Sequence, residues 1–133
     1  MRSDFSGEYV LDRPASTLSA GASAIQSSVM RIEHREPVFR CSATWVADGK
    51  TVLEYSFELL TNGHEVASGE NDVSRLYWDG DALVSEFRTG TPDPVFTMTW
   101  RYELIDERRR LQAIERIRGS GRDQDNVWEF KRQ

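Results

Sequence analysis

The chain has little of what enzymes and metal proteins usually need. It contains one cysteine, Cys41, and two histidines, His34 and His64, and it lacks a glycine-rich phosphate loop, a nucleophile elbow and a metal-binding helix motif. A single cysteine excludes an internal disulfide and a cysteine-based zinc site. Its alternation with Phe39 and Ala43 predicts a buried, unreactive thiol. His34 is placed after a strand and before Pro37, and His64 is placed in a turn, where histidines are usually solvated. The sequence therefore predicts neither a metal site nor a cofactor.

Long apolar runs and an excess of positive charge are absent as well. No apolar run approaches the ~20 residues that span a bilayer, and no apolar signal region opens the chain, so we expect a cytoplasmic protein without a membrane partner. The net charge of −5 at pH 7 does not favour nucleic acid as a partner. One stretch near the C-terminus is nevertheless rich in arginine: Arg108, Arg109, Arg110, Arg116, Arg118 and Arg122. It would form either an anion-binding stripe or an exposed strand face paired with Glu103, Asp125 and Glu129, and the acids interleaved with it favour the second.

What the chain has instead is a repeated turn signal. The pairs Asp48-Gly49, Asn62-Gly63 and Asp79-Gly80 each lie between runs that alternate apolar and polar residues. Asp-Gly and Asn-Gly tolerate positive φ at both central positions of a type I′ turn, so each pair predicts a β-hairpin. Three successive hairpins predict an antiparallel meander.

A period of two persists from residue 29 to the end of the chain and is typical of half-buried strands. The predicted strands are 5–11, 29–33, 39–45, 53–59, 65–71, 73–78, 82–88, 96–104, 111–118 and 126–131, with loops at 89–94 and 119–121. Residues 12–28, with breakers at Pro14 and Gly21, predict a loop or a short helix. Within this segment, residues 13–28 would cover one mouth of the fold. An open sheet of this length would expose two edges, so the short connections favour a single all-β domain, 1–133, built as an antiparallel up-and-down barrel of about 8–10 strands.

Four short segments add a likeness to known proteins: 5–11 (FSGEYVL), 30–34 (MRIEH), 78–84 (WDGDALV) and 130–133 (FKRQ). In these segments the chain resembles the calycins, the superfamily of lipocalins and fatty-acid-binding proteins, and in particular small bacterial lipocalin-like proteins. The lipocalin opening motif pairs glycine with tryptophan two residues later, whereas Gly7 is followed here by Tyr9. The resemblance implies a barrel whose interior holds a small ligand. Fatty-acid-binding proteins hold a ligand carboxylate with arginine, and Arg40 or Arg101 would do so here only if its strand had the opposite register.

Large aromatic rings dominate the strand faces that are predicted to point inward. They are Phe39, Trp45, Tyr55, Phe57, Phe87, Phe96, Trp100, Tyr102, Trp128 and Phe130. These rings would either fill the interior or line an apolar cavity with a few polar anchors, and about half would belong to a packed bottom in either case. The predicted ligand-binding residues are Tyr55, Phe57, Phe87, Met98, Trp100, Tyr102, Glu115 and Trp128.

Glu115 is the most informative polar position, because it shares a strand face with Leu111, Ala113 and Ile117. A lone carboxyl group inside a barrel is unfavourable unless it is paired or protonated, so its pKa would be raised. Such a group would hold a ligand amine or act as a general acid or base. A shift of one residue would instead turn Ile114 inward and leave Glu115 in water, and the sequence leaves this register open.

Three functions remain open at this stage. The preferred hypothesis is non-covalent binding of a small, mostly hydrophobic molecule inside the barrel. The second is an isomerase- or hydrolase-type enzyme in which Glu115 works with Tyr55 or Tyr102, although no catalytic motif supports it. The third is a packed barrel that acts through its outside as an interaction module, and a homodimer is left open.

Overall fold

The computed structural model describes residues 2–67, 69–90, 96–119 and 121–133. Within these residues the chain forms ten β-strands and two short 3₁₀ turns, η1 and η2. The elements are β1 (Gly7–Leu11), η1 (Arg13–Ala15), η2 (Ala20–Ala22), β2 (Ile25–Arg35), β3 (Val38–Ala47), β4 (Lys50–Leu60), β5 (Val66–Ala67), β6 (Asp72–Asp79), β7 (Ala82–Thr89), β8 (Phe96–Ile105), β9 (Arg110–Arg118) and β10 (Gln124–Arg132). No helix among the described residues is long and apolar enough to cross a membrane.

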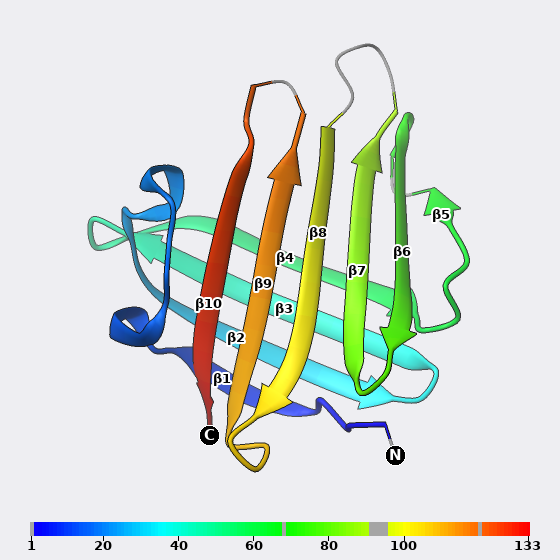
Figure 1. Ribbon diagram of the computed structural model, residues 1–133, viewed down its shortest axis with the longest axis horizontal. Coiled ribbons are helices and arrows are strands. Elements are labelled where there is room, and N and C mark those ends of the chain that lie inside the picture. Colours follow the sequence, from blue (N-terminus) through cyan, green and yellow to red (C-terminus); the bar gives the residue numbers. More distant parts are fainter. Residues whose placement is uncertain (1, 68, 91–95, 120) are drawn as a thin grey trace.

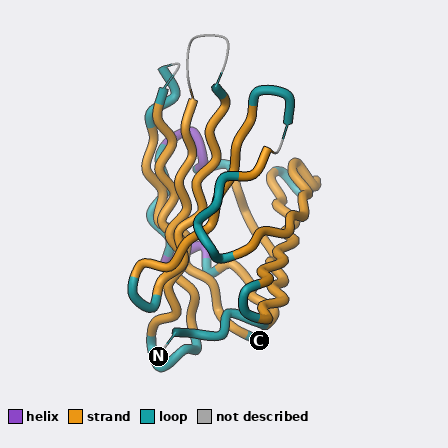
Figure 2. The backbone as a smooth tube through the Cα atoms, turned by 90° about the vertical axis from the view of Figure 1, so that its right-hand side faces the viewer, coloured by secondary structure: helices purple, strands orange, loops and turns teal. Residues whose placement is uncertain are grey.

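The strands make one antiparallel sheet in the order β4-β3-β2-β1-β10-β9-β8-β7-β6-β5. Pairing of β1 with β10 joins the two ends of the chain, while β4 and β5 form the two edges of the sheet. Strands β1–β4 cross behind β6–β10 at a steep angle in Figure 1, and the side view in Figure 2 shows the two resulting layers. The predicted all-β, antiparallel up-and-down architecture is therefore confirmed, as a sheet that curls over on itself.

Two of the three predicted hairpins form. Asp48 and Gly49 make a two-residue loop between β3 and β4 with φ angles of 51° and 72°, as a type I′ turn requires. The hairpin between β6 and β7 is shifted by one residue, because Asp79 still belongs to the ladder and the loop residues are Gly80 and Asp81. Of these two only Gly80 has a positive φ, 64°, which matches a type II′ turn.

The Asn62-Gly63 pair does not make a hairpin, so this prediction is wrong. Strand β4 ends at Leu60, and Asn62 then forms an isolated bridge with Tyr77 of β6. The backbone N–H of Gly63 donates to the carbonyl of Leu76, also in β6, over 2.9 Å. The turn therefore directs the chain across to the second layer instead of back along β4, and this crossing leaves the edge of β4 open.

One part of the interior is packed with side chains. The fully buried residues there include Phe5, Tyr9, Met30, Ile32, Phe39, Leu76, Leu83, Leu111 and Phe130. The Tyr9 hydroxyl donates to the backbone carbonyl of Phe5 over 2.6 Å, so its polar atom is satisfied inside the apolar cluster. Phe39 and Phe130 belong to this core, as expected for a packed bottom of the barrel.

His34 is buried and lies within β2, whereas the sequence placed it after the strand. Its Nδ1 accepts the backbone N–H of Phe5 over 3.2 Å, and its Nε2 lies 3.3 Å from Oε1 of Glu36. Glu36 also accepts hydrogen bonds from Thr61 Oγ1 (2.6 Å) and Trp78 Nε1 (2.7 Å). This polar cluster ties the N-terminal segment, the β2–β3 turn and β6 together. His64 is exposed, as predicted.

The segment between β1 and β2 runs alongside β10 and contains η1 and η2 (Figure 1). Thr17 and Val127 of β10 exchange two backbone hydrogen bonds of 2.8 Å each, which fix the segment against the barrel. The expectation of a loop or short helix starting near Pro14 is met by the 3₁₀ turn η1. Most of the predicted loop at 89–94, and residue 120 of the loop at 119–121, lie outside the described residues.

Candidate functional site

The rest of the interior is a cavity of about 800 Å³ between the two layers of the sheet. Side chains from both layers and from the β1–β2 segment line it. The apolar and aromatic lining residues include Ile25, Trp45, Leu53, Tyr55, Phe57, Leu59, Phe87, Met98, Trp100, Tyr102, Ile117 and Trp128. A concave, mostly apolar cavity of this volume has the usual anatomy of a small-molecule site.

The structure brings all eight predicted ligand-binding residues to this one cavity: Tyr55, Phe57, Phe87, Met98, Trp100, Tyr102, Glu115 and Trp128. Of the predicted inward rings, Phe39 and Phe130 instead fill the packed core. Phe96 lies outside the cavity, where the Arg122 guanidinium stands 5.9 Å from its ring centre. The interior is thus part cavity and part packed core, and the binding role of the lining residues stays a prediction.

The cavity reaches the surface along the free edges of the sheet. Val52 and Leu53 of β4 line it and are 56% and 53% exposed, and Val66 of β5 lines it and is 48% exposed. Gly21 and Ala22 of η2 also border the cavity, so part of the segment predicted to cover a mouth does lie against it. Apolar side chains therefore flank the opening as well as the interior.

Glu115 points into the cavity and is only 7% exposed, so the alternative register with Ile114 inward is wrong. Its Oε1 accepts two hydrogen bonds, from Trp128 Nε1 over 3.1 Å and from Asn126 Nδ2 over 3.0 Å. Both bonds use the same oxygen, and no hydrogen bond from the described residues reaches Oε2. Burial raises the pKa of Glu115, while the two N–H donors lower it in part.

Asn126 was missed by the sequence analysis, although it precedes Trp128 and Phe130 on the inward face of β10. It is 1% exposed, and its Oδ1 accepts the backbone N–H of Ser19 over 2.7 Å. Its Nδ2 also donates to Oε1 of Gln124 over 3.2 Å. Asn126 therefore links the Glu115 carboxyl group to the β1–β2 segment. A polar residue in phase with the inward aromatic residues was the available sequence signal.

Three tryptophan side chains cluster around Glu115. The rings of Trp45 and Trp128 meet edge to face with centres 4.6 Å apart, and Trp100 stacks on Trp128 at 6.5 Å. Trp100 also lies directly opposite Glu115 in the β8–β9 ladder. Stacked and edge-to-face contacts of this kind stabilise an aromatic cluster beyond its burial. The carboxyl group consequently borders this cluster of indole rings through its hydrogen bond with Trp128.

Trp45 has a second feature of interest, its buried indole N–H. This donor has no hydrogen-bond partner among the described residues. The Tyr55 hydroxyl is close enough for this N–H to offset part of the rise in the pKa of Tyr55 that burial causes, but the two groups do not have hydrogen-bond geometry. A buried donor without a partner is unfavourable by about 1–3 kcal/mol. Trp45 was among the predicted inward rings but not among the predicted ligand-binding residues.

The remaining polar groups of the cavity are mainly neutral. Burial raises the pKa values of Tyr55 and Tyr102, so both phenols are protonated at neutral pH. Ser85 and Gln124 add a hydroxyl and an amide. Among the described residues that line the cavity there is no lysine, arginine or histidine, and the acidic residues are Glu115 and, on the edge strand β4, Glu58.

The two arginines considered for a ligand carboxylate lie outside the cavity. Arg40 pairs with Glu58 and with Glu33, whose Oε2 is 3.7 Å from Arg40 Nη1. Arg101 pairs with Glu103 over 2.9 Å and with Asp79 over 3.4 Å. Neither lines the cavity, because both alternate with inward-facing neighbours along their strands.

Two of the C-terminal arginines, Arg110 and Arg118, pair with neighbouring acids, which favours the second of the two interpretations for this part of the stretch. Arg110 Nη2 lies 2.9 Å from Asp12 Oδ2 and 3.2 Å from Glu129 Oε1. Arg118 Nη2 lies 2.8 Å from Asp125 Oδ1. The neighbouring acids thus neutralise these two arginines across the β9–β10 ladder.

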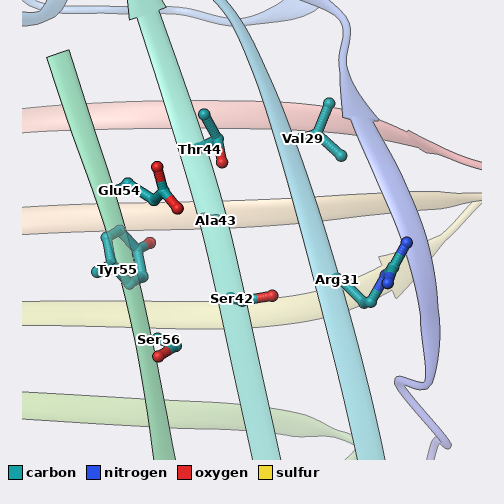
Figure 3. Close-up of a pocket in the computed structure, with 8 residues that line it drawn as sticks. All are labelled: Val29, Arg31, Ser42, Ala43, Thr44, Glu54, Tyr55 and Ser56. Carbon is teal, nitrogen blue, oxygen red and sulfur yellow. The ribbon is translucent and has the colours of Figure 1, made fainter. Parts of the chain in front are cut away.

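A second, open depression lies on the outer face of β2–β4 and is drawn in Figure 3. Ser42 and Thr44 of β3 and Glu54 of β4 project there, beside Arg31 of β2. The Arg31 guanidinium already pairs with Glu8 over 2.9 Å. The charged side chains among its described lining residues, Arg31 and Glu54, are exposed, so we assign the depression no function.

Cys41 is buried as predicted, and burial raises the pKa of its thiol to about 12. A thiol protonated at neutral pH is a poor nucleophile. In the part of the chain that the structure describes, no group of histidine, cysteine and acidic side chains is arranged to hold a metal ion.

Comparison with known proteins supports the fold. No family model matches the chain, and no curated protein matches it in sequence. Among solved structures, human cRBP IV superposes with a TM-score of 0.68 at 15% identity, over 98% of this chain and 99% of that one. A mutant of the fluorescent protein UnaG gives 0.67 at 15% identity, over 97% and 96%. The REP1-NXSQ fatty acid transporter gives 0.63 at 17% identity, over 98% and 96%. The chain therefore shares the all-β fold of these proteins, as its sequence resemblance implied.

Proposed function

We propose that the protein binds a small, mostly hydrophobic molecule inside the barrel. The observation that carries this proposal is the cavity of about 800 Å³, which is lined by aromatic side chains and holds one inward carboxyl group. Protein interiors are normally close-packed, and voids larger than a water molecule are few. A void of this size is explained if an occupant fills it.

Two further features support the same function. The unpartnered indole N–H of Trp45 would gain an acceptor from an occupant or from water that enters with it. One structural neighbour is described as a fatty acid transporter, which is consistent with an apolar ligand for this fold. Burial of apolar ligand surface would supply most of the affinity, at roughly 25 cal/mol per Å² before ordering costs are subtracted.

The other two hypotheses receive less support. A barrel that acts only through its outside needs no internal void. The acid–base hypothesis pairs Glu115 with Tyr55 or Tyr102, whereas the described donors to Glu115 are the non-titrating side chains of Asn126 and Trp128. Ligand binding uses the cavity as it stands.

Native mass spectrometry of freshly purified protein, compared with the same sample denatured, tests the proposal. We expect an additional mass on the 15.3 kDa chain that disappears on denaturation. The variant Ser85→Phe, which places a ring in the cavity, should lose this mass. The matched variant Ser42→Phe adds the same ring to the outer face and should retain it. Equal retention by both variants, or the same mass on denatured protein, would contradict binding in the cavity.

A further inference from the structure

On the premise of the proposed function, we propose that the cavity selects hydrophobic amines, held as ammonium ions by Glu115, and rejects hydrophobic carboxylates of the same length. The ligand class is thus an apolar body that carries one cationic head. The argument rests on the charges that line the cavity, on the geometry of Glu115 and on the rings around it.

The charges inside the cavity have one sign. Its described lining residues include one inward acid, Glu115, and no cationic side chain; Glu58, at the edge of the cavity, is already paired with Arg40. Arg40 and Arg101 are engaged by acids on the outer surface. A ligand carboxylate would therefore meet a like charge with no counter-ion, whereas an ammonium ion would supply the missing positive charge.

The geometry of Glu115 leaves room for one more donor. Oε1 is occupied by the N–H groups of Trp128 and Asn126, which are neutral and do not balance a negative charge. Oε2 receives no hydrogen bond from the described residues. An ammonium N–H that donates to this oxygen would form a charge-assisted hydrogen bond, which is about twice as strong as a neutral one.

The rings around Glu115 suit a cation as well. Trp100 lies across the ladder from Glu115, Trp128 donates to it, and Trp45 packs edge to face on Trp128. Faces of tryptophan rings attract cations within about 6 Å of the ring centre. The apolar body of the ligand would then lie against Phe57, Phe87, Met98 and their neighbours. The net charge of −5 adds a general attraction for cations.

The test compares three ten-carbon probes at pH 7.5: decylamine, decanol and decanoate. At this pH the amine is an ammonium ion and the acid a carboxylate. Binding is followed by tryptophan fluorescence, because Trp45, Trp100 and Trp128 line the cavity, and dissociation constants are confirmed by titration calorimetry. We expect decylamine to bind at least about tenfold more tightly than decanoate, with decanol between them.

Glu115→Gln keeps the size of the side chain and its acceptor oxygen but removes the charge. It should weaken decylamine binding by about tenfold or more, strengthen decanoate binding and leave decanol binding nearly unchanged. Glu54→Gln removes the same charge from the exposed outer face of β4 and should leave all three affinities as they are.

The possible failures are distinguishable. If none of the three probes saturates the wild-type fluorescence change, the proposed binding function itself fails. If all three bind but decanoate binds as tightly as decylamine, the function stands and amine selection is refuted. Amine selection is also refuted if Glu115→Gln and Glu54→Gln change the amine-to-carboxylate ratio equally, because the preference would then come from net charge.

Discussion

Replacement of Asn126 by alanine is expected to destabilise the fold by about 3.5–5 kcal/mol. The wild-type side chain is 1% exposed and makes three hydrogen bonds: to Glu115 Oε1 (3.0 Å), to Gln124 Oε1 (3.2 Å) and from the Ser19 N–H (2.7 Å). Two neutral bonds contribute about 1 kcal/mol each, and a bond to a carboxyl group contributes about 1.5–3 kcal/mol when that group is charged. This sum is a large share of the 5–15 kcal/mol that typically stabilises a domain.

Urea unfolding followed by tryptophan fluorescence measures this effect. With a denaturant dependence of about 1.5 kcal/mol per M, within the range for small proteins, the midpoint should fall by about 2–3 M. Hydrogen exchange adds a local readout, because the Ser19 amide loses its acceptor and should exchange faster in the variant.

The neighbouring variant Asp125→Ala serves as the control. Asp125 pairs with Arg118 on the exposed face of β10, and an exposed ion pair contributes at most about 1 kcal/mol. The network that joins Glu115 to the β1–β2 segment would be refuted by two observations together. The urea midpoint of Asn126→Ala would be as close to wild type as that of Asp125→Ala, and the Ser19 amide would still be protected from exchange.

Three further outcomes can be measured on the same purified protein. Burial raises the folded-state pKa of Glu115 above 4.5, so the folded chain keeps a proton that the unfolded chain releases, and wild-type stability should fall as pH rises from about 4.5. The test measures the urea midpoints of wild type and Glu115→Gln at pH 4.5 and at pH 8. The variant should be more stable relative to wild type at pH 8 than at pH 4.5. An equal difference between the two proteins at both pH values would contradict a buried carboxyl group. Cys41 should react with a thiol reagent at pH 8 only after denaturation, since burial raises its pKa to about 12, and rapid labelling of the folded chain would show that the core is open there. Leu83→Ala, at a fully buried position, should lower the free energy of unfolding by about 2–5 kcal/mol. Val29→Ala, at a position 45% exposed, should change it by about 0.5 kcal/mol or less. Similar losses of stability in both variants would contradict the assigned core.

The strand content and the inward faces were predictable because both depend on local sequence. A period of two separates the faces of a strand, and it placed Tyr55, Trp100 and Trp128 correctly on the inner side. The Asp48-Gly49 pair specified its turn because positive φ at two successive positions needs such residues. The same local rule failed at Asn62-Gly63, where the chain bonds to β6, a partner that no local pattern identifies.

The polar part of the site was only partly predictable. Glu115 was recognised by the apolar residues that share its strand face, but strand register alone could not exclude Ile114 as the inward residue. Pairing with Trp100 on one side and Asn126 on the other decided the register. Asn126 itself had no local signal for its role, because its partner Ser19 lies 107 residues away.

By itself, therefore, the sequence determined the antiparallel strands, their inward aromatic faces and the presence of one carboxyl group among them, since each follows from the alternation of neighbouring residues. Only the tertiary structure decided which rings fill the core and which surround a cavity. It also decided that His34 is buried against the N–H of Phe5 and that no arginine is among the described residues that line the cavity. These outcomes depend on how the two layers of the sheet cross, and that crossing brings together side chains that are far apart along the chain.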